Sequence, residues 1–358
     1  MTGLEGHTNR KDEHLRLALG ADVGFASVTT GLDRYRVHAR ALPERDLADV
    51  DLSASLWGHR LAAPLLLSCM TGGSGQAGPV NRALAAAAQA HRVAVGLGSG
   101  RVLLEDPART EGFLVRDVAP DVPLLANLGA VQIREQGVAG CRRLVEQCRA
   151  DGLVLHVNAV QEAVQPGGDT EFGGLADDIA GVVAALEVPV MVKEVGFGLA
   201  PEDVDLLLEA GVDGIDVAGA GGTNWARLEG HRDDVAGAVA AAFDDWGWPT
   251  ADAVLRARQV LDRRGAGHVV LVGSGGLRHG VDALKVLCLG ADVAGLARGV
   301  LAAAARGPEE ATQAVGILLR QLRVAAWASG VAGVGDLEPG RLEPVGGPLA
   351  GGGEDDRR

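Results

Sequence analysis

Short apolar runs alternate with longer alanine- and leucine-rich stretches along most of the chain. The short runs are nearly continuous in apolar residues, as expected of parallel β-strands covered on both faces. The expected strands are Leu65–Cys69, Val93–Leu97, Val122–Asn127, Leu153–Asn158, Val188–Lys193, Gly214–Ala218, His268–Gly273 and Asp292–Ala297. The stretches between them predict helices, among them Pro79–His91, Cys141–Arg149, Pro201–Ala210, Ala251–Arg264 and Val281–Leu289.

Eight strand–helix units predict an α/β fold, a (β/α)8 TIM barrel built as one domain. A doubly wound open sheet is the alternative, but that fold rarely contains eight evenly spaced units. We expect an N-terminal arm and cap over residues 1–60 and the barrel over 61–338. Residues 339–358 are rich in glycine and proline and predict a flexible, disordered tail.

Polar residues and glycines gather just after the expected strands, where a barrel of this kind carries its chemistry. These strand ends are Met70–Gly73, Gly98–Ser99, Asn127–Gly129, His156–Glu162, Lys193–Glu194, Gly219–Trp225 and Gly273–Gly276. Their concentration at one end of the strands is stronger evidence for a functional barrel mouth than any single motif.

The end of the fourth strand carries the densest polar group. His156 and Asn158 point the same way if the strand continues through them, because alternate residues of a strand share a face. Gln161 and Glu162 then fall in the loop beyond. Glutamine does not titrate and glutamate does, so the pair suits a polar substrate and a hard cation. The alternative is a strand end that becomes polar on reaching solvent.

Composition limits the classes of molecule that the protein is expected to bind. The net charge of the 358-residue chain is −14, which argues against nucleic acid, so an anionic substrate needs a local basic site or a metal ion. Aromatic residues make up only 3% of the chain, so small aliphatic side chains must fill the core. The four cysteines have no paired metal-ligand spacing and predict reduced thiols in a cytoplasmic protein. No signal peptide or membrane-spanning run is expected.

Two strand ends predict an anion or cofactor site. The glycines of Ser274–Arg278 expose backbone N–H groups, and with Ala297-Arg298-Gly299 one unit later they favour a phosphate, although a glycine pair can also be a simple turn. Lys193 ends an apolar strand and suits the N1/C2 carbonyl edge of a flavin, unless it extends to solvent. Arg10 and Lys11 suit a diphosphate, and the alternative is a solvated charged face.

Taken together, the chain resembles the type 2, FMN-dependent, isopentenyl diphosphate isomerases from Asn9 to about Ala326. The most specific motifs are His156–Glu162 with Gln165–Asp169, Lys193–Gly198, Gly221–Trp225 and Asp245–Thr250. The resemblance implies interconversion of isopentenyl and dimethylallyl diphosphate with FMN, Mg²⁺, and NADPH to reduce the flavin. It also implies a homo-oligomer, a tetramer or octamer.

The resemblance also assigns residues. Substrate contacts are implied for Arg10, Lys11, Ser99, Arg101, His156, Asn158, Gln161 and Trp225, and Mg²⁺ coordination for Glu162. FMN contacts are implied for Met70, Thr71, Gly72, Ser99, Asn127, Lys193 and Thr223, with the phosphate on Gly275, Gly276, Arg278, Ala297 and Arg298. Gln161, His156 and Lys193 are the catalytic candidates together with reduced FMN, which is the preferred acid and base. Ala218, Asn224 and Gly100 depart from the family pattern.

Three rival functions remain open. A 2-hydroxy-acid oxidase type of FMN oxidoreductase needs a histidine base and an arginine for the substrate carboxylate, and His279 and Arg278 resemble that pair. An IMP dehydrogenase-like enzyme needs a nucleophilic cysteine after strand six, and no cysteine stands there. The third alternative is a non-catalytic flavin- or phosphate-binding barrel, in which Glu162 and the Arg10-Lys11 pair would have no function.

Overall fold

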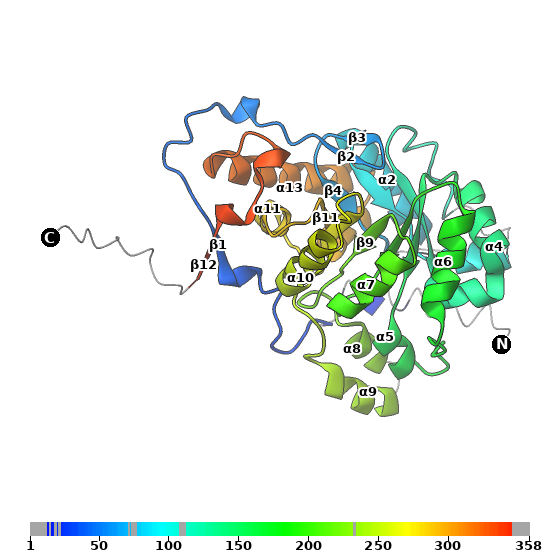
Figure 1. Cartoon of the computed structure of the whole chain (residues 1–358). Coiled ribbons are helices and arrows are strands. Elements are labelled where there is room, and N and C mark those ends of the chain that lie inside the picture. The colour runs from blue at the N-terminus through cyan, green and yellow to red at the C-terminus, as the bar shows by residue number, and fades with distance from the viewer. Residues whose placement is uncertain are drawn as a thin grey trace.

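The computed structural model describes residues 13, 16–17, 20, 23–70, 72, 77–106, 112–231 and 234–345. Eight parallel strands close into a barrel, in which the last strand pairs with the first (Figure 1). The strands are β4 (Leu65–Leu67), β5 (Ala94–Gly96), β6 (Leu124–Gly129), β7 (Gly152–His156), β8 (Val190–Lys193), β9 (Gly214–Asp216), β10 (Val270–Ser274) and β11 (Val293–Leu296). Each predicted strand is present, which confirms the (β/α)8 barrel.

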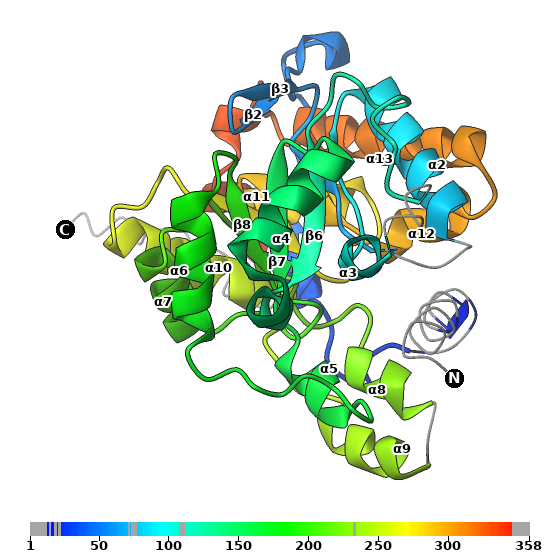
Figure 2. The same ribbon diagram turned by 90° about the vertical axis from the view of Figure 1, so that its right-hand side faces the viewer.

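Helices surround the barrel and follow the strands in chain order (Figure 2). They are α2 (Ala77–His91), α3 (Arg101–Glu105), α4 (Ile133–Cys148), α6 (Leu175–Ala185), α7 (Pro201–Glu209), α10 (Thr250–Arg263), α11 (Gly280–Cys288), α12 (Arg298–Ala304) and α13 (Pro308–Ala328). Local sequence explains two of the helix termini. Pro201 occupies the first turn of α7, where its fixed φ is favourable, and Arg149 ends α4 in the left-handed conformation.

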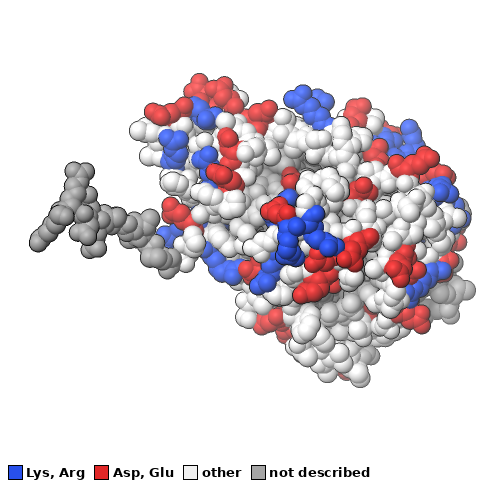
Figure 3. All heavy atoms as spheres, viewed as in Figure 1, with Lys and Arg blue, Asp and Glu red and all other residues white. Residues whose placement is uncertain are grey.

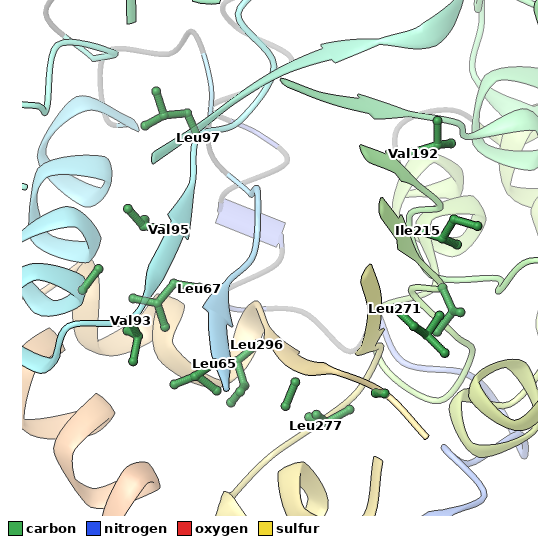
Figure 4. Packing of buried hydrophobic residues seen from close by; sticks show 14 of the residues in the cluster. Leu65, Leu67, Val93, Val95, Leu97, Val192, Ile215, Leu271, Leu277 and Leu296 are labelled. Atoms are coloured by element: carbon green, nitrogen blue, oxygen red, sulfur yellow. The ribbon is translucent and has the colours of Figure 1, made fainter. Parts of the chain in front are cut away.

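Alternation along the short strands builds two apolar layers. Leu65 and Leu67 of β4 pack into the layer between strands and helices, together with Val95, as Figure 4 shows. Leu66, between them, joins the core inside the barrel. Because successive strand residues point to opposite faces, nearly continuous apolar strands are required to fill both layers.

The two ends of the barrel differ. A hairpin of β2 (Ala54–Leu56) and β3 (His59–Leu61) contributes Leu56 and Leu61 to the inner core at one end. Three short helices lie at the other end: α5 (Ala159–Val164), α8 (Trp225–Gly230) and α9 (Asp234–Ala240), as Figures 1 and 2 show. The hairpin therefore plugs the end of the barrel opposite the polar strand ends.

The terminal segments pack on this barrel. Residues 339–345, the start of the segment expected to be flexible, form a 3-10 turn, η7 (Pro339–Arg341), and β12 (Leu342–Pro344). β12 pairs antiparallel with β1 (Tyr35–Val37). The rest of the expected tail, residues 346–358, and Arg10 and Lys11 of the expected arm lie outside the described residues.

Charged side chains of both signs lie on the surface. Acidic and basic side chains are interspersed on the face shown in Figure 3. None of the helices in the described part of the chain is both long and apolar enough to span a bilayer. All four cysteines are free, and three of them are buried.

Candidate active site

A cavity of about 730 Å³ opens at the carboxyl ends of the barrel strands. The predicted site residues that the structure describes all line it: Met70, Gly72, Ser99, Arg101, Asn127, His156, Asn158, Gln161, Glu162, Lys193, Thr223, Trp225, Gly275, Gly276, Arg278, Ala297 and Arg298. Arg10, Lys11 and Thr71 lie outside the described residues. Strand ends that are distant in sequence are thus brought to one place by closure of the barrel.

Strand register sets the first row of side chains. His156 ends β7 and pairs with Gly129 of β6 on one side and Lys193 of β8 on the other. Lys193 in turn pairs with Asp216 of β9. His156 Nδ1 lies 3.1 Å from Asn127 Oδ1. Because an amide oxygen only accepts, this arrangement puts the proton on Nδ1.

Gln161 and Glu162 do not lie in a loop as expected. They belong to α5, and Asn158 is the residue that precedes this helix rather than part of the strand. The helix is only 6 residues long, so its periodicity is too short to be read from sequence. Gln161 and Glu162 are each 9% exposed, and both still line the cavity.

A buried hydrogen-bond chain links these residues. Gln161 Nε2 donates to Glu229 Oε1 at 3.0 Å. Asn158 Nδ2 donates to Gln161 Oε1 at 3.2 Å and to Glu162 Oε1 at 2.7 Å. The carboxyl oxygens of Glu229 and Glu162 accept these bonds, so they fix which way both intervening amides face. The bonds therefore run outward from Asn158, through Gln161 to Glu229 on one side and directly to Glu162 on the other.

Glu162 is held from a second side. Its Oε2 accepts the backbone N–H of Asp169 at 2.8 Å and the side-chain amide of Gln165 at 3.2 Å. No group of three or more potential metal-ligating side chains is found among the described residues. A cation at Glu162 would therefore take most of its ligands from water and substrate, as Mg²⁺ commonly does.

Lys193 lies above a buried polar floor. Its Nζ donates to the Glu194 carbonyl at 2.7 Å. Asp216 is fully buried, and its Oδ1 accepts the Ser274 hydroxyl at 2.5 Å. Burial raises the pKa of Asp216, and the charge of Lys193 opposes that rise. Burial also raises the pKa of the nearby Cys69 thiol to about 12, so this cysteine is no nucleophile at neutral pH.

Arg101 is already engaged by acidic side chains at the cavity rim. It donates to Glu105 at 2.7 Å, to Asp169 at 3.2 Å and to Glu135 at 3.4 Å. Its guanidinium is therefore fixed in place before any ligand binds. An anion at this position has to compete with, or rearrange, these ion pairs.

The glycine-rich loops after β9 and β10 pack backbone to backbone. Gly275 and Gly276 have φ values of +111° and +68°. A Cβ at Gly275 would lie 2.1 Å from the Gly219 carbonyl, and one at Gly276 would lie 2.6 Å from the Gly221 carbonyl. Loop packing alone thus requires glycine here. Arg278 lies at the rim with its side chain 70% exposed and paired with Asp282 at 3.0 Å.

The three departures from the family pattern have structural explanations or consequences. Asn224 caps α8, because its side chain accepts the N–H of Arg227 at 3.0 Å. Gly100 packs against α4, since a Cβ would lie 2.4 Å from a methyl carbon of Leu144. Ala218 has a φ of +37°, in the left-handed region that non-glycine residues rarely adopt.

Sequence reasoning missed Glu229 and Ser68. Glu229 lies four residues after Trp225, one helical turn along α8, and that spacing places both on one side of the helix. Ser68 also lines the cavity, one residue beyond β4. A search one turn beyond Trp225 would have found Glu229, whereas Ser68 lay inside the strand expected over Leu65–Cys69 and had no separate signal.

Known proteins resemble the chain over nearly its whole length. It is 48% identical over 340 residues to an isopentenyl-diphosphate delta-isomerase of Synechococcus sp., covering 94% of this chain and 96% of that one. A Nostoc sp. protein of the same name is 43% identical, covering 92% and 94%. The chain belongs to the isopentenyl-diphosphate delta-isomerase family. A family profile described as FMN-dependent dehydrogenase matches residues 168–344, in agreement with the FMN-dependent, type 2 enzymes.

Solved structures support the fold of this family member. A flavocytochrome b2 variant with sulfite bound superposes with a TM-score of 0.69 at 20% identity, covering 92% of this chain and 82% of the other. A mandelate oxidase variant superposes with a TM-score of 0.64 at 21% identity, covering 95% and 98%. At this identity the likeness concerns the barrel architecture, and function rests on the site.

Proposed function

We propose that this protein interconverts isopentenyl diphosphate and dimethylallyl diphosphate, with FMN as cofactor. Mg²⁺ would bind the diphosphate group of the substrate. NADPH would keep the flavin reduced without being consumed in each turnover. The observation that carries the proposal is the near-full-length similarity to isomerases of that name. The gathering of every predicted site residue that the structure describes around one cavity supports it. The free thiols fit the reducing cytoplasm that we propose as its compartment.

The cavity fits a flavin at its floor. Ser68 Oγ and Asn127 Nδ2 are buried and have no hydrogen-bond partner among the described residues, apart from the Cys69 sulfur beside Asn127. Buried polar atoms of this kind usually serve a ligand or water. Lys193 places a positive charge beside them, which favours an anionic ring edge. We propose Met70, Thr71, Gly72, Ser99, Asn127, Lys193 and Thr223 as the flavin contacts.

The FMN phosphate fits the glycine-rich side of the cavity. Gly275, Gly276 and Arg298 line it there, and loops that offer backbone N–H groups bind phosphate well. Arg278 is held at the rim by Asp282 and adds positive charge. Bound reduced FMN supplies a proton donor and acceptor at its N5 edge. With Gly275, Gly276 and Arg298, we assign Arg278 and Ala297 to the phosphate.

The substrate diphosphate belongs at the opposite rim. Glu162 holds Mg²⁺ there, because its carboxylate is already oriented by Asn158 and Asp169. Arg101 contributes a fixed positive charge, and we propose that Arg10 and Lys11 complete the site. The positive charges of these three residues offset the negative charges of Glu135 and Asp169, which would otherwise repel a diphosphate. Ser99, His156, Asn158 and Gln161 are proposed to contact the substrate, with Trp225 against its hydrocarbon part.

Gln161 is the side chain best placed to relay or orient a proton. Its amide nitrogen carries two hydrogens, of which one is used by Glu229. Its oxygen has a second lone pair beyond the one that accepts from Asn158. A neutral amide is a poor base, so Gln161 orients rather than abstracts. His156 holds its Nδ1 proton toward Asn127 and adds a polar group beside the substrate.

The competing reading is a 2-hydroxy-acid oxidase type of oxidoreductase, which the solved structures of similar fold suggest. Those structures are about 20% identical, whereas the named isomerases reach 48%. His279, the histidine that this reading needs, caps α11 by accepting the N–H of Asp282 at 3.2 Å. It therefore serves the helix rather than a substrate.

The test starts from each substrate separately. Purified protein with FMN, NADPH and Mg²⁺ is incubated anaerobically with isopentenyl diphosphate or with dimethylallyl diphosphate, and products are separated by chromatography. The proposal predicts that both reactions reach the same mixture of the two isomers. Absence of the second isomer from either side contradicts it.

A further inference from the structure

Glu194 carries a buried carboxylate to which catalysis as described above gives no role. It follows Lys193 at the end of β8 and is 7% exposed. Its Oε2 accepts three successive backbone N–H groups, from Gly196 and Phe197 at 2.5 Å each and from Gly198 at 3.2 Å. A carboxylate inside a turn of amides is a strong local restraint, because charge-assisted hydrogen bonds exceed neutral ones.

The loop held in this way has an unusual backbone. Gly196 and Gly198 have φ values of +150° and +78°. Such values leave the backbone little intrinsic preference for the shape, so external bonds must select it. Glu194 supplies three of them from a single atom. The loop conformation therefore depends on this one side chain.

One side of the loop forms a wall of the cavity. Val195 and Gly196 both line it. A Cβ at Gly196 would lie 2.6 Å from the Thr223 carbonyl and 3.5 Å from Trp225 Cδ1. The Gly196 backbone thus supports the loop that carries Thr223 and Trp225.

The other side of the loop binds the Asp245–Thr250 segment. Trp248 N donates to the Phe197 carbonyl at 2.7 Å. Gly247 approaches so closely that a Cβ would lie 2.5 Å from the same carbonyl. Phe197 also meets Phe25 edge-on, with ring centroids 6.0 Å apart. Three segments distant in sequence therefore meet at the loop that Glu194 holds.

We infer that Glu194 is a positioning residue for the substrate wall: it fixes residues 195–198 against Thr223 and Trp225, and thereby sets the shape of the pocket for the hydrocarbon part of the substrate. The inference rests on the proposed isomerase function for its kinetic consequence only. Its structural consequence, a restrained loop, is independent of activity.

The test compares Glu194→Gln and Glu194→Ala with the exposed control Glu187→Gln. Glutamine keeps one acceptor oxygen and loses the charge, whereas alanine loses the acceptor. Deuterium exchange of peptides spanning residues 194–199 is measured on the FMN-loaded protein at pH 8. We expect exchange about tenfold faster in Glu194→Gln, with no change in Glu187→Gln. Unchanged exchange in Glu194→Gln overturns the inference, whether or not the alanine variant folds.

Kinetics gives the second readout. We expect KM for isopentenyl diphosphate to rise about tenfold in Glu194→Gln, and further in Glu194→Ala, while the Kd of FMN stays within about threefold. Loss of FMN together with substrate affinity would mean that Glu194 supports the whole barrel mouth and would overturn the inference. If the unaltered protein lacks isomerase activity, the proposed function fails, while the exchange result still decides the role of Glu194 in the loop.

Discussion

Gln161 Nε2 lies 3.0 Å from Glu229 Oε1, inside the protein, and joins two residues 68 positions apart. Glu229 is fully buried on α8, and Gln161 lies at the start of a short helix after β7. The bond turns the amide oxygen of Gln161 toward Asn158, which in turn donates to Glu162. The group proposed to relay a proton and the group proposed to hold the metal are thereby parts of one network.

Replacing Glu229 by glutamine should lower kcat about tenfold or more, because the acceptor that fixes the Gln161 amide becomes a group that can also donate. KM should change little, since Glu229 does not line the cavity. Steady-state kinetics of Glu229→Gln beside the exposed control Glu202→Gln measures both parameters. An unaltered kcat in Glu229→Gln would mean that the hydrogen bond from Gln161 to Glu229 does not contribute to catalysis.

Replacing Glu162 by glutamine should raise the Mg²⁺ concentration for half-maximal activity at least about tenfold, because an amide oxygen is a much weaker ligand for a hard cation. The surrounding donors Asn158 and Asp169 remain in place, so the fold should survive. A Mg²⁺ titration of activity checks this, with circular dichroism as the control for folding. An unchanged titration curve would assign the metal elsewhere.

Replacing Lys193 by methionine should make reduction of bound FMN harder by about 30–60 mV, because a positive charge near the anionic reduced ring is lost. Lys193→Arg keeps the charge and should stay closer to the unaltered protein. Equilibrium photoreduction with reference dyes measures both potentials. Equal potentials in the methionine variant and the unaltered protein would place Lys193 away from the ring.

The titration of Glu194 should contribute stability that is lost as the pH rises. Burial raises the pKa of this carboxyl from 4.5 to about 7, against the opposing backbone N–H groups and Lys193. At this group the folded state then binds more protons than the unfolded state between these values, so the contribution of Glu194 to stability is full below pH 4.5 and is lost up to pH 7. The full effect is about 3 kcal/mol. Urea unfolding of Glu194→Gln at pH 5 and pH 8 should lack this component, and parallel changes in both proteins would contradict it.

Replacing Gly100 by alanine should destabilise the protein by about 1–3 kcal/mol, because the new methyl group meets the buried Leu144 side chain. Shortening Leu144 to alanine makes room for it. The double variant should therefore be more stable than the sum of the two single changes predicts, as a double-mutant cycle measures. Additive losses would mean that Leu144 relaxes away without cost.

The barrel was predictable because its strands, such as Leu65–Leu67, are buried on both faces and must therefore be apolar throughout. Such continuous apolar runs are visible in the local sequence. The cavity followed from barrel geometry, which brings the residues after each strand together. Helix α5 was not predictable from its pattern, because six residues carry too few turns to show a helical period.

The partners of the site residues were the hardest part to foresee. Arg101 looks like an unengaged cation in sequence, yet Glu105 one turn along its own helix and the distant Glu135 and Asp169 surround it. Glu229 and Gln161 come together only when α8 folds over the barrel mouth. The contacts between distant segments depend on tertiary packing, so the local sequence does not show them.

The ratio of isomer formed to NADPH consumed tests the central claim most directly. The protein is loaded with FMN and reduced anaerobically with a limited amount of NADPH, and isopentenyl diphosphate is supplied in excess with Mg²⁺. The account predicts many molecules of dimethylallyl diphosphate for each NADPH oxidised, since the reaction involves no net redox change. Consumption of one NADPH for each product molecule, or oxidation of the substrate, would contradict it and favour an oxidoreductase.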